Sequence, residues 1–402
     1  MSEFSQKNML ALYPAEDSGF PDRFFPMRRC VKELTLLNYA DACHTRGIQA
    51  AEKLIRGIIA GKKIDLVLVC PFASDYQLSP EFYSSLRGAA GVAFWFADDP
   101  LYFNSYTRYY GAAADAVVTT DPEALTEWKR LGVPAVLCSD ITSNNRYAPV
   151  SVEKDIDVCF VGDLSKRGRR DYIEFLRAAG IQVAVYGRGS ENGYLPPEKI
   201  SGTFCRSRVN LNFTGVGEPD WKTGGHPPLG GGRQNTGRSR EIALTGAFCL
   251  TEFSPGLERT FPGGIMDSFR DREELLEKVK FYLAEPEKRE ALAAAAHKYA
   301  QENYRAEIYL PRIFSELAEA LKDRRPAGVG GLPADFKARE INSLTFSFLL
   351  MLKRGALLPA IRALPLLFRR GAAAFLRGFP AGLVRGLAAL AASLRRSGSG
   401  RP

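Results

Sequence analysis

Short, continuous runs of apolar residues recur along the chain, and each is followed by a stretch of helical character. Examples are Ile64–Val69 (IDLVLV), Gly91–Ala97 (GVAFWFA), Ala116–Thr119 and Ile156–Val161 (IDVCFV). Strands without polar alternation suit a parallel sheet that is buried on both faces. Strands that alternate with helices at this spacing predict parallel, doubly wound α/β sheets.

The strand and helix pattern can be traced twice, which predicts two such domains in a chain of 402 residues. The first half opens with the apolar run Met9–Pro14, continues through a predicted helical stretch over about 28–61, and ends with the strand Pro134–Cys138. A polar stretch near Asp140–Ser151 separates the halves. We expect an N-terminal domain over residues 1–148, a C-terminal domain over 149–324 and a tail over 325–402.

The net charge of +9 belongs to the tail rather than to the two domains. No acidic residue follows Glu340, whereas ten basic residues do, so residues 1–340 carry a net charge of −1. Binding to a phosphate backbone needs a basic face. The near-neutral body therefore argues against nucleic acid as a partner.

The cysteines are seven in number, an odd count, and none forms a CxxC motif. The N-terminal residues lack the apolar core of a signal peptide. Together these features predict a reduced, cytoplasmic protein without a disulfide framework or a zinc site.

The residue pattern of the tail predicts an amphipathic helical segment. Arginines recur every seven or eight residues from Arg362 to Arg385, with leucine, phenylalanine and alanine between them, which places arginine along one stripe of a helix. We expect Pro359, Pro365 and Pro380 to break this segment into short helices. The hypothesis is that residues 341–396 dock on an anionic membrane, peripherally on its inner face. A disordered basic tail is the alternative.

Residues Arg233–Phe253 (RQNTGRSREIALTGAFCLTEF) predict a binding site for an anion that also carries hydroxyl groups. A loop with three arginines runs into a short helix that carries Glu241, and an apolar strand follows. Backbone N–H groups at a helix start and neighbouring arginines bind phosphate, and a carboxylate accepts hydrogen bonds from a ribose diol. The alternative is a solvated charge cluster on a surface loop.

Two further strand ends carry candidate residues. The loop Gly162–Arg170 contains Lys166 and Arg167 between a strand and a helix, which favours contact with a diphosphate over a solvated basic loop. Gly187 ends another strand, where it would let a ligand approach the backbone. The glycine clusters match neither dinucleotide-binding nor P-loop motifs.

Asp98 and Asp99 follow the aromatic strand of the first half. A carboxylate near Trp95 and Phe96 would have a raised pKa and is a candidate general base for an acceptor hydroxyl. A capping or turn role before Pro100 is the alternative. Among the three histidines, His226 lies in the long glycine-rich segment Thr214–Gly237, where it could reach a ligand.

The second half resembles a known family through GRSREIALTGAFCLTEFSPGLERTF and EELLEKVKFYLAEPEKREALAAAAHKYAQENY. These segments resemble the C-terminal domain of CgeB-like (spore-maturation type) glycosyltransferases of the GT-B fold, which are related to glycosyltransferase families one and four. The resemblance covers roughly residues 156–320. It implies two facing Rossmann-like domains, with a nucleotide-sugar donor on the second and the acceptor on the first.

The resemblance also implies roles for single residues. Glu241 matches the glutamate expected to bind the donor ribose, and Arg238 and Arg240 match basic positions near the diphosphate. Such enzymes need no bound metal, and no cofactor is expected. One position departs from the pattern, because related retaining enzymes often carry a second glutamate eight residues before the first, where this chain has Arg233.

We therefore predict a metal-independent glycosyltransferase that moves a sugar from a nucleotide-sugar to a surface-glycan or lipid-linked acceptor. One alternative on the same architecture is a nucleotide-sugar epimerase. The other is a catalytically inactive module that binds a glycan or a protein partner.

Overall fold

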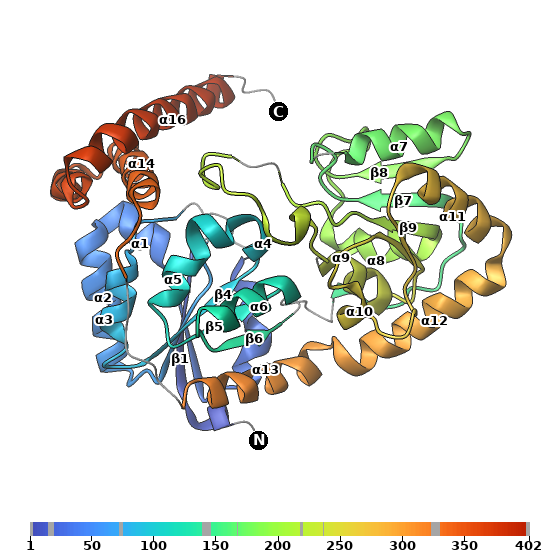
Figure 1. The fold of residues 1–402 in the computed structure, drawn as a ribbon, viewed down its shortest axis with the longest axis horizontal. Helices are drawn as coiled ribbons and strands as arrows, with labels where there is room; N and C mark the ends of the chain where they lie inside the picture. The colour runs from blue at the N-terminus through green and yellow to red at the C-terminus, as the bar shows by residue number, and fades with distance from the viewer. Residues whose placement is uncertain are drawn as a thin grey trace.

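The chain folds into two α/β domains, each built on a sheet of parallel strands, and a helical tail rests on the first domain (Figure 1). The computed structural model describes residues 3–14, 20–71, 75–138, 146–166, 168–217, 220–235, 237–322 and 330–398.

The first sheet has six strands in the order β2-β1-β3-β4-β5-β6, and all its neighbours are parallel. Along β1, Met9 and Ala11 pack in one core and Leu10 and Leu12 in another, as expected for a sheet buried on both faces. The strands are Asn8–Tyr13 (β1), Glu33–Asn38 (β2), Leu66–Val69 (β3), Gly91–Phe96 (β4), Ala116–Thr119 (β5) and Ala135–Leu137 (β6).

The helices of the first domain cover both faces of this sheet. They are η1 (Glu3–Gln6), η2 (Phe20–Arg29), α1 (Tyr39–Arg46), α2 (Ile48–Gly61), α3 (Pro80–Leu86), α4 (Asp99–Tyr102), η3 (Phe103–Thr107), α5 (Arg108–Ala112) and α6 (Pro122–Arg130).

The helical stretch predicted over about 28–61 is wrong in its first part, where the strand β2 pairs with β1 at the edge of the sheet; the remainder is helical, as α1 and α2. The amide of Asp41 donates to Asn38 Oδ1 (3.0 Å), which starts α1 directly after the strand. The run Glu33–Asn38 (ELTLLN) is too short for its leucine spacing to distinguish a helix from a strand, and pairing with β1 decides it.

The second sheet has five parallel strands in the order β11-β10-β9-β7-β8. They are Ile156–Val161 (β7), Val183–Tyr186 (β8), Ser207–Asn212 (β9), Cys249–Glu252 (β10) and Ser268–Phe269 (β11). The helical segments of this domain are α7 (Arg169–Ala178), α8 (Pro197–Arg206), η5 (Leu229–Gly232), α9 (Gly237–Leu244), α10 (Leu257–Thr260), α11 (Arg272–Ala284) and α12 (Pro286–Asn303).

Helix α13 (Ala306–Ala320) crosses back from the second domain to the first (Figure 1). Tyr309, Ile313 and Phe314 are buried in the core that β1, β3 and β4 share with η2. The expected boundary at residue 324 therefore does not follow the packing, because α13 completes the core of the N-terminal domain.

The tail forms α14 (Ala334–Lys353), α15 (Leu357–Ala363), η6 (Leu364–Phe368) and α16 (Ala372–Gly398). Helices α14 and α16 pack closely through glycine. A Cβ atom on Gly378 would lie 2.2 Å from the carbonyl oxygen of Ala338, and one on Gly382 would lie 2.4 Å from that of Asn342. The expectation that Pro380 would break the helix is wrong, because α16 continues through it and this close packing offsets the lost hydrogen bond.

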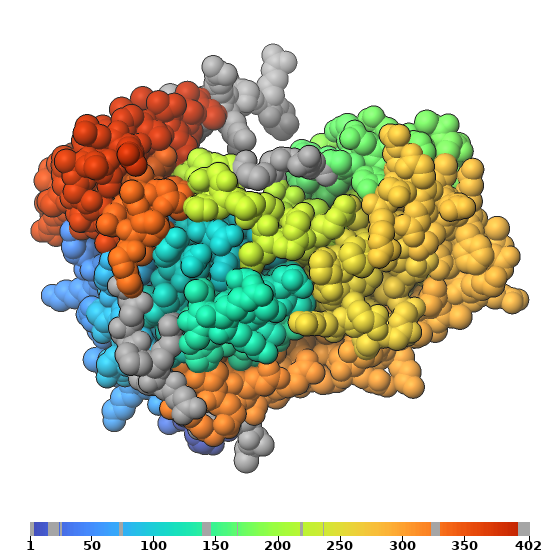
Figure 2. All heavy atoms as spheres, in the orientation of Figure 1, coloured from blue at the N-terminus to red at the C-terminus, as the bar shows by residue number. Residues whose placement is uncertain are grey.

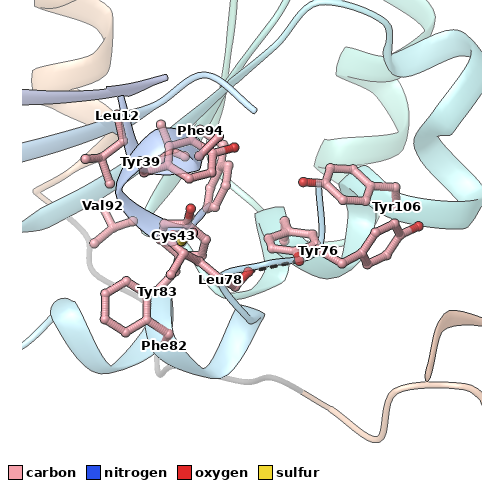
Figure 3. Packing of buried hydrophobic residues seen from close by; sticks show 14 of the residues in the cluster. Leu12, Tyr39, Cys43, Tyr76, Leu78, Phe82, Tyr83, Val92, Phe94 and Tyr106 are labelled. Atoms are coloured by element: carbon pink, nitrogen blue, oxygen red, sulfur yellow. Dashed lines mark hydrogen bonds between the residues drawn. The ribbon is translucent and has the colours of Figure 1, made fainter. Parts of the chain in front are cut away.

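Buried aromatic side chains gather beyond the carboxyl ends of β3 and β4 (Figure 3). Tyr76 meets Tyr106 edge-on at a ring-centroid distance of 5.0 Å. Phe336 of α14 packs edge-on against Tyr76 at 5.3 Å and is itself fully buried. The tail is thus part of the N-terminal core.

Candidate functional site

The carboxyl ends of the two sheets meet through the segment that precedes α9. Gln234 Nε2 donates to the carbonyl of Ala97 and to the Thr120 hydroxyl, both at 2.8 Å. Ala97 follows β4 and Thr120 follows β5, so the segment from the second domain contacts the edge of the first sheet where ligands bind in open α/β folds.

Glu252 anchors this segment from the end of β10. Its Oε2 atom accepts hydrogen bonds from the backbone N–H groups of Thr214 (2.9 Å) and Gly215 (3.1 Å), and its Oε1 atom forms an ion pair with Arg233. Gly215 and Arg233 also form an antiparallel β-bridge. The carboxylate is buried, so these contacts compensate its desolvation.

Arg169 lies between β7 and this segment at the start of α7. Its guanidinium donates to the carbonyls of Asp163 (3.0 Å) and Gly215 (3.4 Å) and lies over the Phe160 ring. Burial lowers the pKa of Arg169, an effect that the nearby Asp163 and Glu252 carboxylates oppose and Arg238 reinforces. Its Nε atom has no hydrogen-bond partner among the described residues, which leaves a buried donor for a ligand.

Glu241 and Arg238 lie one turn apart on α9 and form an ion pair of 2.5 Å. Tyr147, from the connection between the domains, forms a hydrogen bond with Glu241. Burial raises the pKa of Tyr147, and the charge of the Glu241 carboxylate raises it further. The Arg238 guanidinium lies over the Phe204 ring. Both side chains are mostly buried, so their geometry is held before any ligand binds.

Gly162 and Gly187 directly follow β7 and β8, and their backbones lie in close contact. The amide of Gly162 donates to the carbonyl of Tyr186 (2.8 Å), and a Cβ atom on Gly187 would lie 2.1 Å from the carbonyl oxygen of Gly162. Gly187 also has φ of +117°. Only glycine fits there, which keeps this edge open to close approach by a ligand.

The two consecutive aspartates of the first domain occupy different environments. Asp98 is exposed after β4. Asp99 is fully buried, and its Oδ2 atom accepts a hydrogen bond from Trp128 Nε1 (3.1 Å). Burial raises the pKa of Asp99 to about 6, against the effect of the neighbouring Thr107, Thr119 and Trp128 side chains. Of the predicted pair, Asp98 is the one accessible to an acceptor.

The tail holds the far part of the glycine-rich loop. Arg385 of α16 stacks on Trp221 with its Cζ atom 3.8 Å from the ring centroid, and its other neighbour is Phe346 at 4.5 Å. His226 Nε2 lies 3.0 Å from Asp335 Oδ2 of α14. His226 thus contacts the tail in this structure.

The residues predicted for the donor form two separate contacts in the structure. Arg238 and Glu241 form an ion pair on α9, and Gly162 and Gly187 contact each other at the ends of β7 and β8. Their role in donor binding stays a prediction. Lys166 is exposed in the loop before α7. Arg240 lies apart from them, because it is buried on the opposite side of α9 with its guanidinium over the Tyr304 ring. The predicted Arg167 lies outside the described residues.

Four residues of the site were not among the predicted site residues, namely Arg169, Gln234, Glu252 and Tyr147. Arg169 belongs to the basic loop that the sequence singles out, and only its burial separates it from the exposed Lys166. Glu252 ends the apolar strand and gives no motif. Its partners Thr214 and Arg233 are far from it in sequence.

Comparison with known proteins agrees with this architecture. Residues 167–310, less than half of the chain, match the model of a family described as glycosyl transferase-like. No curated protein matches the sequence.

Solved structures with a similar fold include three proteins of low sequence identity. Sucrose-phosphate synthase from Thermosynechococcus elongatus has 12% identity and a TM-score of 0.54, over 79% of this chain and 98% of that chain. A glycosyltransferase from Rickettsia africae has 10% identity and a TM-score of 0.56, over 80% and 100%. The Anabaena protein HepE in complex with UDP has 10% identity and a TM-score of 0.53, over 78% and 99%.

The fold is GT-B, with the two parallel sheets that the sequence predicts. The match of residues 167–310 to a glycosyl transferase-like family supports the predicted class, a glycosyltransferase.

Proposed function

We propose that this protein transfers a sugar from a nucleotide-sugar donor to a hydroxyl group of a surface-glycan or lipid-linked acceptor. The observation that carries this proposal is the meeting of Arg169, Arg238 and Glu241 at the carboxyl edge of the second sheet. The buried Nε–H of Arg169 has no hydrogen-bond partner among the described residues. Arg238 is close enough for its charge to lower the pKa of Arg169. Two cations and a carboxylate match a diphosphate and a ribose diol.

The chemistry of the transfer depends on the leaving group of the sugar, the nucleoside diphosphate. The acceptor oxygen bonds to the anomeric carbon while the bond from that carbon to the diphosphate oxygen breaks. Negative charge then develops on the diphosphate, where Arg169 and Arg238 stabilise it in place of a metal ion. Neither cation has to move far, since protein contacts already fix both.

We propose a uridine nucleotide as the donor. HepE from Anabaena was solved with UDP and with UDP-glucose, and it shares the fold across almost its whole length. The sequence pattern around Glu241 supports the narrower assignment to the CgeB-like type. Tyr147 and Arg238 would orient the Glu241 carboxylate toward the ribose.

Asp98 is the proposed base for the acceptor hydroxyl. It is exposed directly after β4, next to Ala97, whose carbonyl receives the hydrogen bond from Gln234 of the second domain. The carboxylate therefore stands where the acceptor half of the site meets the donor half.

Titration calorimetry with UDP and UDP-sugars tests the donor site. Replacement of Glu241 by Ala is expected to weaken UDP binding about ten- to a hundredfold, because a hydrogen bond to a charged acceptor contributes about 1.5–3 kcal/mol. Arg238→Ala should weaken it similarly. Arg208→Ala is the matched control, since Arg208 pairs with Asp157 at the amino ends of β9 and β7, away from the carboxyl ends where the proposed site lies. Unchanged affinity in Glu241→Ala would refute the ribose role.

Product analysis separates the transfer reaction from its alternatives. A transferase releases UDP in step with the glycosylated acceptor. An epimerase yields a second UDP-sugar instead, and an inactive binding module consumes no donor.

A further inference from the structure

The outer face of the tail carries an apolar surface that no part of the described chain covers. We call this the apolar tail surface. Its residues on α15 and η6 are Leu357, Leu358, Ile361, Leu364 and Phe368, and those on α16 are Leu376, Val384 and Leu387. Leu376 and Val384 are 71% and 70% exposed. Soluble proteins rarely leave so many large apolar side chains in one short segment, so such a surface indicates an interaction site.

The exposure is concentrated in the tail. Among the described residues, nine of the fifteen exposed large hydrophobic side chains lie between Leu352 and Leu387. On α16, Leu376, Val384 and Leu387 are spaced eight and three residues apart, which places them on one side of the helix. Gly378 and Gly382 occupy the other side, against α14.

Four arginines of the predicted stripe divide into two groups, and the fifth, Arg385, lies on Trp221. Arg369 and Arg370 face inward and form ion pairs with the buried Glu340, and Arg370 also makes a two-pronged contact with Glu81 at 2.7 and 2.8 Å. The contact with Glu81 holds the tail to the body, and the pairs with Glu340 join two parts of the tail to each other.

Arg362 and Arg377 form the second group. Both are exposed, beside Ile361 and Leu376 of the apolar tail surface. No acidic residue exists after Glu340 to neutralise them from the tail itself. An apolar face with cationic side chains along it matches the boundary between acyl chains and anionic headgroups.

Helix α16 is long and apolar enough over Ala372–Ala392 to cross a bilayer, judged by length and composition alone. Its packing favours a helix that lies on the membrane. Gly378 and Gly382 are in close contact with α14, and Arg385 is engaged with Trp221 on the body of the protein. Spanning would break both contacts.

We infer that the apolar tail surface docks the protein on an anionic lipid bilayer, in the plane of the headgroups. The tail also lies over the carboxyl end of the first sheet, where Arg339 donates to the carbonyl of Ser105 at 2.9 Å. Docking would therefore place the acceptor half of the proposed site next to the membrane. Lipid binding itself does not depend on the proposed transfer reaction.

Flotation of the full chain with lipid vesicles tests this inference. We expect binding to vesicles of phosphatidylcholine mixed with phosphatidylglycerol, weaker binding to phosphatidylcholine alone, and a loss of affinity at high salt. The double variant Leu376→Glu/Val384→Glu should bind at least about tenfold more weakly, because it places charge in the apolar layer. Ile308→Glu is the matched control, since Ile308 is 44% exposed on α13, away from the tail.

A second variant, Arg362→Glu/Arg377→Glu, should lose binding to the anionic vesicles while keeping the residual binding to neutral ones. Unchanged thermal unfolding and unchanged UDP affinity in both double variants show that fold and donor site are intact. Equal binding by the parent and Leu376→Glu/Val384→Glu would overturn membrane docking. A parent dimer in solution that this variant dissociates would overturn it too, by assigning the surface to a second copy of the chain.

Discussion

Asp98 and Asp99 are neighbours in the chain, yet their side chains lie in different environments. Asp98 is exposed, whereas the Asp99 carboxylate is buried and accepts a hydrogen bond from Trp128. The raised pKa of Asp99, about 6, means that the folded state holds a proton that the unfolded state, with a carboxyl pKa near 3.8, has already lost. Stability therefore falls as pH rises from about 4 to about 6, and the cost is complete above that range.

We predict that Asp99→Asn flattens this dependence. The amide oxygen can still accept the Trp128 N–H, and no charge has to be buried. Between pH 4 and pH 7.5 the free energy of unfolding should fall less in the variant than in the parent. The difference between the two falls should be up to about 3 kcal/mol, the value for a shift of about two pKa units. Denaturant titrations at both pH values measure it. Asp98→Asn should leave that dependence unchanged and lower kcat by about a hundredfold or more. The reverse pattern would make Asp99 the base.

At the scale of elements, the glycine-rich loop is held by contacts from its own domain at one end and from the tail at the other. Its near end pairs with Arg233 and is anchored by Glu252, and its far end is held by α16 through Trp221 and Arg385. Burial lowers the pKa of Arg385 to about 10, which accords with a guanidinium between two aromatic rings. The tail thus positions the loop that leads into the proposed donor site.

A double-mutant cycle on Arg385→Ala and Trp221→Ala checks this contact. We expect a coupling free energy of about 1–2 kcal/mol in thermal or denaturant unfolding, the range for a partly desolvated cation–π contact. Each single variant should also weaken UDP binding, because the freed loop must be ordered again when the donor binds. Arg362→Ala, in the exposed part of the tail, is the control. Zero coupling would show that the stacking does not hold the loop.

At the scale of the whole molecule, two late segments complete the first domain. Helix α13 fills one core, and Phe336, Ile341 and Met351 of α14 fill the other. From outside, α13 and the tail are seen to lie against the first domain (Figure 2). All three α14 side chains are fully buried. The N-terminal domain therefore depends on chain that follows the second domain, which ties the two domains together during folding.

A chain that ends at Lys322 should accordingly lose the stability of its N-terminal domain. Each missing large core side chain costs about 2–5 kcal/mol, so the sum approaches the whole stability of a domain. Hydrogen exchange should show loss of protection in β3 and β4 and continued protection in β7 and β9. A truncated chain with the melting temperature of the parent would contradict this. The same dependence makes point variants, rather than truncation, the sound test of membrane docking.

The sequence by itself predicted two parallel α/β sheets, which the structure confirms, and a glycosyltransferase, which the family match supports. It also singled out the segment around Glu241, whose binding role stays a prediction. These follow from local patterns, since apolar runs, caps and glycine at strand ends act within a few residues. Only the tertiary structure decided that β2 is an edge strand, that Asp99 and Arg240 are buried, and that Glu252 and Arg169 belong to the site. It also decided that Arg369, Arg370 and Arg385 of the predicted stripe face inward, toward Glu340 or the body. Burial and pairing depend on residues far apart in the chain, and no local pattern records which side chains will meet.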